Sequence, residues 1–264
     1  MNEKKKFIAF FDLLGFKQFI ENNDEKEQQR VIDNILRDIE QSLVKQKDGS
    51  LMNKKVNGSS IVADLEYIKI NTLSFSDTIV FWTNDNSLDS LEKLLIASKE
   101  FNFRMNKFNF PIRGALVYGN IYKLFGQHES KEGFHYGVNS VFGEGIVKAY
   151  EKAESQEWAG TVIDQSIIDF ITEDNIHILE NYAKKYKVPY KTSSQRKEEE
   201  LVLNLIDTND KINRSNIKFI ENYIEGIKKN FARYNKPTDS NSIQNKITNT
   251  INFINSYKNN IPSL

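Results

Sequence analysis

Two aspartates each stand at one end of a short, continuously apolar run. Asp12 follows residues 7–11, and Asp77 precedes residues 78–82. A carboxylate at the edge of a buried strand is costly unless a cation or a hydrogen-bond donor meets it. Two such carboxylates indicate a shared divalent metal ion. Each also has a simpler interpretation, Asp12 as a helix N-cap and Asp77 as an ordinary turn residue.

The residues after Asp12 add a place for a polyphosphate. Leu13, Leu14, Gly15 and Phe16 lead from the apolar run directly into a helical pattern. A tight, glycine-bearing turn at a helix N-terminus directs backbone amides toward negatively charged oxygen atoms. The acid and the turn together therefore predict a site for a metal-bound polyphosphate.

Arg113 is the third candidate, because it is an arginine inside the apolar pattern of residues 111–119. It could face the charge that develops during phosphoryl transfer, and Lys148 is a second candidate for this role. Losing such a donor costs on the order of 3 kcal/mol, or about a hundredfold or more in rate. Arg113 could instead be the structural ion-pair partner of a buried carboxylate.

The elements that must position these residues alternate along the chain. Strands are predicted at residues 7–12, 61–73, 77–83, 111–119 and 160–164. Helices are predicted at 17–45, 88–105, 145–155 and 165–171, the first with a loop or a solvated bridge at 21–29 and the second capped by Asn86 or Ser87. Residues 74–76 are expected to join the strands at 61–73 and 77–83 as a hairpin, which presents Asp77 at one end of the sheet. Residues 45–60 and 126–137 are expected to be loops. This order predicts an α+β sandwich with helices over a mixed sheet.

The sequence also predicts two parts of the chain. Residues 5–180 form one domain. Residues 181–264 form a C-terminal extension packed on it, with a possible strand at 200–207 and two helices, because isoleucines recur at helical spacing in 217–231 and 243–254.

Composition limits the partners. Of 264 residues, 39% are hydrophobic, which is enough to build a core. Lys plus Arg and Asp plus Glu are 36 each, so the zero net charge gives no reason to expect nucleic-acid or membrane binding. Cysteine is absent, which excludes disulfides and thiolate metal sites. Without a signal peptide or a stretch of membrane-spanning length, a cytoplasmic protein is expected.

Four segments carry a resemblance to a known family. They are FFDLLGF at 10–16, FSD at 75–77, RGALVYG at 113–119 and FGEGIVKAYE at 142–151. Over roughly residues 5–171 the chain resembles the class III nucleotidyl cyclase catalytic domain, and within that group it is similar to the bacterial Pycsar pyrimidine cyclases. The resemblance implies a class III cyclase-like sandwich with a ferredoxin-like core.

The resemblance also implies a site and a reaction. Asp12 and Asp77 would hold two Mg²⁺ or Mn²⁺ ions with help from the Leu13 carbonyl. The backbone amides of residues 13–16 would bind the β- and γ-phosphates of a nucleoside triphosphate. Attack of the ribose 3′-hydroxyl on the α-phosphate would give a 3′,5′-cyclic nucleotide and pyrophosphate. Two metal ions suit this reaction, which mostly requires positioning and charge neutralisation. The protein would be a homodimer with active sites at the subunit interface.

The sequence departs from the family pattern at positions that decide which base is bound. Purine cyclases carry a lysine where this chain has Leu73 and a polar base-reading residue where it has Ser140. With the last motif aligned on Gly143, their transition-state Asn and Arg fall on Val147 and Glu151. Both pairs are missing, which favours a pyrimidine over adenine.

We therefore interpret the chain as a metal-dependent phosphorus–oxygen lyase that converts UTP, or as second choice CTP, to the cyclic nucleotide. The Pycsar resemblance implies a role in antiphage signalling, with a separate effector that binds the product. Two alternatives remain open. One is a degenerate cyclase-homology module that binds a nucleotide without turnover, and the other is an adenylate or guanylate cyclase with rearranged base recognition.

Overall fold

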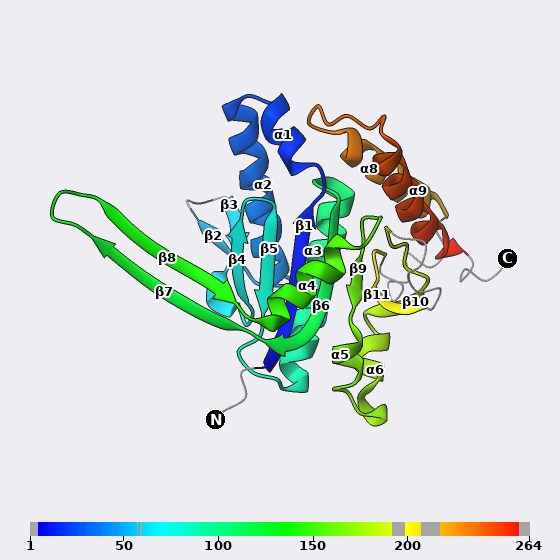
Figure 1. Cartoon of the computed structure of the whole chain (residues 1–264), viewed down its shortest axis with the longest axis horizontal. Helices are drawn as coiled ribbons and strands as arrows, with labels where there is room; N and C mark the ends of the chain where they lie inside the picture. The colour runs from blue at the N-terminus through cyan, green and yellow to red at the C-terminus, as the bar shows by residue number, and fades with distance from the viewer. Residues whose placement is uncertain (1–4, 57, 59, 192–198, 207–216, 259–264) are drawn as a thin grey trace.

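A seven-stranded sheet forms the centre of the structure, a computed structural model that describes residues 5–56, 58, 60–191, 199–206 and 217–258 (Figure 1). In chain order its strands are β1 (Lys5–Leu13), β4 (Asn71–Phe75), β5 (Thr78–Trp82), β6 (Ile112–Asn120), β9 (Thr161–Ile163), β10 (Ala183–Tyr186) and β11 (Glu200–Leu203). The spatial order is β10-β11-β9-β6-β1-β5-β4. Only the β6–β9 pair is parallel within this sheet, so the sheet is mixed.

Strand β1 is buried on both faces, which explains its continuous apolar run. Successive side chains point to opposite faces of a strand. Phe7 and Phe11 therefore enter the main core beneath α2 (Glu25–Leu43) and α3 (Leu88–Phe108). Ile8 and Phe10 pack on the other face beneath α4 (Glu144–Glu154).

The remaining helices are short or belong to the C-terminal part. They are α1 (Phe16–Asn22), α5 (Gln165–Ile168), α6 (His177–Glu180), α8 (Ile217–Ala232) and α9 (Asn241–Asn255), with 3₁₀ turns η1 (Leu65–Tyr67) and η2 (Glu173–Asn175). The predicted helix at 88–105 is confirmed as α3, and Ser87 caps it by accepting a hydrogen bond from the Ser90 amide. The predicted helix at 17–45 is two helices, α1 and α2.

Two predicted loops are wrong. Residues 45–60 include β2 (Asn53–Val56), which pairs with β3 (Ser60–Ala63). Residues 126–137 lie within a hairpin of β7 (Tyr122–Glu129) and β8 (His135–Phe142), which projects away from the rest of the molecule (Figure 1). Most side chains of this hairpin are exposed, so no buried period marks its strands in the sequence.

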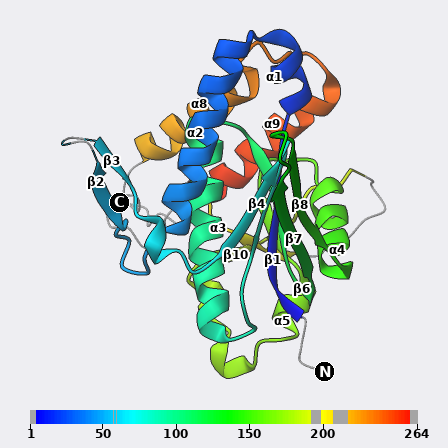
Figure 2. The same ribbon diagram turned by 90° about the vertical axis from the view of Figure 1, so that its left-hand side faces the viewer.

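The segment after residue 181 continues the main sheet before it becomes helical. The strand predicted within 200–207 is β11, which pairs with β9 and β10; residue 207 lies outside the described residues. Helices α8 and α9 share an apolar cluster with Trp158 and with the end of β11. Both views show the turn between these helices beside α1 (Figures 1 and 2). The predicted α+β architecture with a C-terminal helical extension is confirmed.

Candidate active site

A pocket with a volume of about 620 Å³ opens where β1 leaves the sheet and turns into α1. This volume is within the usual range for small-molecule sites. The charged side chains that line it are three acidic residues, Asp12, Asp77 and Glu154, and five basic residues, Lys17, Arg113, Lys191, Lys236 and Lys246. The lining therefore contains both kinds of group that a metal-bound anion requires.

The strand pairing brings Asp12 and Asp77 to the same end of the sheet. Asp12 is the penultimate residue of β1 and pairs with Thr78, the first residue of β5, and Asp77 lies in the turn just before Thr78. The Leu13 amide donates a hydrogen bond of 2.9 Å to the Asp77 carbonyl, which joins the two segments directly. Both carboxylates line the pocket, so the structure brings together the two acids that the sequence singled out.

Arg113 lies directly across the β1–β6 pair from Asp12. Its Nε atom donates to Asp12 Oδ2 at 2.7 Å, and the residue is only 7% exposed. Burial raises the pKa of Asp12 above its ordinary value, and the Arg113 guanidinium opposes this effect. The structure thus gives Arg113 the ion-pair position that the sequence left as an alternative.

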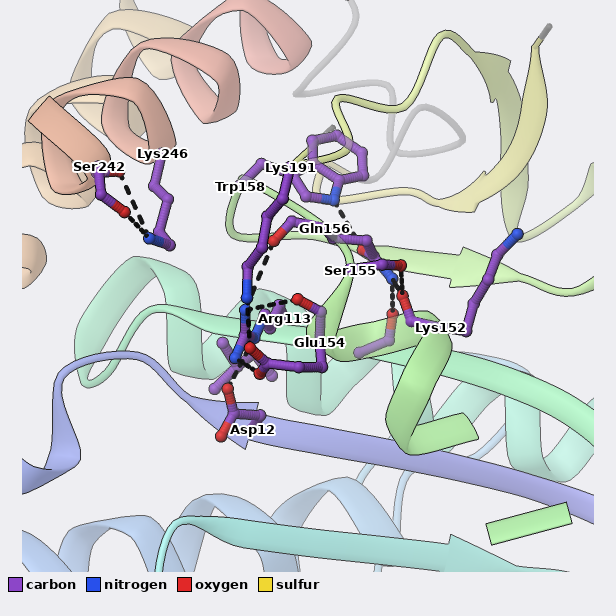
Figure 3. A network of polar contacts seen from close by, with 12 residues as sticks. Asp12, Arg113, Lys152, Glu154, Ser155, Gln156, Trp158, Lys191, Ser242 and Lys246 are labelled. Carbon is purple, nitrogen blue, oxygen red and sulfur yellow. Dashed lines mark hydrogen bonds and ion pairs between the residues drawn. The ribbon is translucent and has the colours of Figure 1, made fainter. Parts of the chain in front are cut away.

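A second carboxylate also neutralises Arg113. The Arg113 Nη2 atom donates to the carboxylate of Glu154, at the end of α4. Lys191 pairs with the same carboxylate (Figure 3). The charge of Arg113 is therefore shared between Asp12 and Glu154. This arrangement leaves Arg113 less able to face a developing negative charge.

The carboxylates of Asp12 and Asp77 suit a hard divalent cation that takes its other oxygen ligands from phosphate or water. Arg113 occupies one Asp12 oxygen, and the Asp77 carboxylate has no hydrogen bond or ion pair to any described residue. Within the described ranges no three His, Asp or Glu side chains gather closely enough to hold a metal ion alone. Mg²⁺ commonly uses one or two carboxylates together with substrate phosphates and water. Asp12 and Asp77 fit that pattern. Leu13 follows Asp12 in the chain and is hydrogen-bonded through its amide to the Asp77 carbonyl.

The glycine turn lies where the sequence predicts it, but fewer of its backbone amides are available to a phosphate. Gly15 has φ +82°, a left-handed conformation that favours glycine. The prediction that the amides of residues 13–16 all bind phosphate is wrong for Leu13 and Leu14, whose amides donate to the carbonyls of Asp77 and Pro111. The amides of Gly15 and Phe16 remain at the start of α1, which has no side-chain cap.

Lys148 does not line the pocket, so the structure does not bring it together with Asp12 and Asp77. Its Nζ atom is 2.8 Å from Asp164 Oδ1, at the end of β9. Helical spacing explains this placement, because residues four apart share a face of α4. Tyr150 and Glu154 share the face that lines the pocket, and Lys148 lies on another.

Lys236 and Lys246, from the α8–α9 part of the C-terminal extension, line the pocket and were not predicted. Lys236 is 6% exposed, and its Nζ atom lies 4.0 Å from the Phe110 ring centroid. Burial lowers the pKa of Lys236 to about 7. Lys246, on α9, donates to Ser242 Oγ at 2.7 Å (Figure 3). The sequence carries no local signal for these positions, because they come from the other end of the chain.

Comparison with solved structures finds distant neighbours of this chain. No protein-family model and no curated protein matches the chain. The guanylate cyclase domain of RhGC from Catenaria anguillulae, solved with GTP, has a TM-score of 0.48 at 9% identity and covers 76% of this chain and 96% of its own. The dimeric guanylyl cyclase domain of RhoGC from Blastocladiella emersonii has 0.46 at 11%, with coverages of 75% and 93%. A class III adenylyl cyclase-like ATP-binding protein from Pseudomonas aeruginosa has 0.37 at 12%, with coverages of 64% and 35%.

At these values the likeness does not establish a family for this chain. Its function has to be inferred from the geometry of the pocket itself.

Proposed function

We propose that this chain is a metal-dependent nucleotidyl cyclase. The observation that carries the proposal is the convergence of Asp12 and Asp77 in one pocket with the Gly15 turn and several basic side chains. A metal-bound triphosphate needs hard oxygen ligands for the cation and positive groups for its phosphates. A two-carboxylate, glycine-turn pocket of this size provides both.

Each group then has a part in the reaction. Asp12 and Asp77 would hold Mg²⁺ or Mn²⁺, which when bound would neutralise phosphate oxygens and activate the ribose 3′-hydroxyl. Arg113 is a positioning residue, because it fixes the Asp12 carboxylate through Oδ2. The amides of Gly15 and Phe16 would donate to the phosphates. Tyr150, half exposed at the pocket rim and edge-on to Phe10, offers a ring for stacking on the base.

A pyrimidine triphosphate, UTP before CTP, is the proposed substrate. Leu73 packs against the apolar cluster on the α4 side of the sheet, and Ser140 belongs to the projecting hairpin. Neither residue lines the pocket. The resemblance to Pycsar cyclases supports a role for the product as an antiphage signal for a separate effector.

A homodimer with active sites at its interface is supported by exposed apolar surface. Phe125 on the β7–β8 hairpin is 75% exposed, and Phe134 at its tip is 72% exposed. Val147 and Tyr150 are also exposed on α4, next to the pocket. Large apolar side chains exposed on a projecting hairpin and beside the pocket are surface that a second copy of the chain would cover. No helix in the described part of the chain is long and apolar enough to cross a membrane.

Incubation with each of the four nucleoside triphosphates and Mn²⁺ tests the proposal. Mass spectrometry of the product and a pyrophosphate assay are the readouts. UTP is expected to give cyclic UMP and pyrophosphate, and D77N is expected to abolish both. D89N is the matched control, because Asp89 is an exposed residue of the first turn of α3. Absence of pyrophosphate with every nucleotide would favour the binding module, and a purine product would overturn the base assignment.

A further inference from the structure

We propose that Lys236, in the turn between α8 and α9, binds the terminal phosphates of the nucleotide. The C-terminal extension would thereby complete the triphosphate site. This inference rests on the proposed function and names a residue of the same pocket that the cyclase motifs do not contain.

Most cations of the pocket already have acidic partners. Arg113 pairs with Asp12 and Glu154, and Lys191 pairs with Glu154. The Lys17 Nζ atom lies 3.6 Å from Glu21 Oε1, and both residues are on α1. Within the described part of the chain, Lys236 and Lys246 are the lining cations that make no ion pair, and both belong to the extension. The positive charge available to an incoming anion therefore comes from α8–α9.

Lys236 lacks any partner that suits an ammonium group. Its Nζ atom is buried without a hydrogen bond to any residue that the structure describes. Among the described residues, the Lys236 Nζ atom lies over the face of Phe110. A buried charge is costly unless it is paired, and a cation–π contact offsets only part of that cost. Because Lys236 lines a pocket proposed for an anion, the bound ligand would be the partner of its ammonium group.

The Lys236 stem lies on the glycine turn itself. A Cβ atom built on Gly15 would be only 3.0 Å from Lys236 Cδ, so the missing side chain makes room for the lysine. The Gly15 and Phe16 amides begin α1 at this point. Lys236 is therefore next to the backbone donors that would bind the same phosphates.

The turn that carries Lys236 is held in an unfavourable conformation. Tyr234 and Asn235 have φ values of 63° and 55°, in the left-handed region that residues other than glycine rarely adopt. The Asn23 and Asn22 side chains donate to their carbonyls at 2.7 and 2.8 Å. Such strain persists only where the surroundings over-determine it, and it clusters at functional sites.

These contacts connect the extension to the phosphate turn. Asn22 ends α1, and Asn23 follows it, while Gly15 precedes the same helix. The backbone of Lys236 is thus fixed to the helix whose first turn faces the phosphates. Only the flexible side chain must move, from the Phe110 face to a phosphate oxygen.

Calorimetric titration of the full chain with inorganic tripolyphosphate and Mg²⁺ tests this role. K236M keeps most of the stem but removes the charge, and it is expected to weaken binding by about 10- to 100-fold. K236R is expected to bind more tightly than K236M, because it retains the cation. K228M is the matched control, since Lys228 is an exposed α8 residue paired with Glu225, and its affinity should equal that of the wild type.

The outcomes separate this inference from the cyclase proposal. Unchanged tripolyphosphate affinity in K236M overturns the role of Lys236, even if the protein cyclises UTP. Weakened binding in K236M, with no turnover of any nucleotide by the wild type, supports the phosphate role while the cyclase proposal fails. If K236M does not fold, K236Q is compared with K236R, and equal affinities for these two overturn the inference.

Discussion

Replacing Lys236 with methionine should stabilise the ligand-free protein, and the gain should depend on pH. Burial lowers the pKa of Lys236 to about 7 in the folded protein. In the unfolded chain a lysine has a pKa of about 10.4. Because the folded state disfavours the charged form, Lys236 destabilises folding fully below pH 7. This penalty disappears as the pH rises toward 10.4.

The two pKa values set the expected size of the effect. The penalty is on the order of 4 kcal/mol at pH 7, about 2 kcal/mol at pH 9 and less than about 1 kcal/mol at pH 10. K236M also loses the contact with Phe110, which offsets about 1 kcal/mol. The net gain in the free energy of unfolding should therefore be about 3 kcal/mol at pH 7 and should vanish above pH 9 to 10.

Urea denaturation of wild type and K236M at pH 7, 8.5 and 10 measures this difference, with K228M as the control. Saturating triphosphate should reduce the gain of K236M at pH 7 by about 1.4 to 2.7 kcal/mol, because the wild type binds it about 10- to 100-fold more tightly. A K236M protein less stable than the wild type at pH 7, or a difference that does not change with pH, would refute the description of Lys236 as a buried, unpaired cation.

Two further predictions concern the surroundings of the pocket. R113M should lower the free energy of unfolding by about 3 kcal/mol, because it leaves the partly buried Asp12 carboxylate without its partner. Urea denaturation at pH 7 measures this loss. A loss below about 0.5 kcal/mol would contradict the ion-pair role of Arg113. G114A should cost about 2 to 3 kcal/mol, because its Cβ would lie 2.7 Å from the Phe10 carbonyl oxygen. G126A, whose Cβ would meet only Tyr136 at 3.8 Å, is the matched control, and equal melting temperatures for the two glycine variants would contradict the close β1–β6 packing.

The parts of the site that are local in sequence could be predicted. The apolar run before Asp12 becomes an interior strand of the sheet, and both of its faces are covered. Asp77 lies in a short turn between two paired strands, so the hairpin pattern indicated its end of the sheet. The proximity of the two acids then follows from antiparallel pairing of β1 with β5, which a strand–turn–strand order makes natural.

The parts that depend on long-range packing could not be predicted. Lys236 looks like an ordinary surface lysine, and its burial arises only because α8 and α9 place their turn on α1. The β7–β8 hairpin was missed for the opposite reason. Phe125 and Tyr136 are exposed there, so no buried face imposes a period of two on the sequence. Lys148 pairs with Asp164 instead of lining the pocket, because the face of α4 on which a residue lies is set by how the helix packs.

The most direct test locates the metal ion. Crystals of the protein with Mn²⁺ and a slowly reacting UTP analogue, measured by anomalous diffraction, should show Mn²⁺ in contact with both the Asp12 and the Asp77 carboxylates. In D77N that signal should be lost or strongly reduced under the same conditions. A Mn²⁺ signal that touches neither carboxylate, or one that persists unchanged in D77N, would contradict the assignment of this pocket as a two-aspartate nucleotide site.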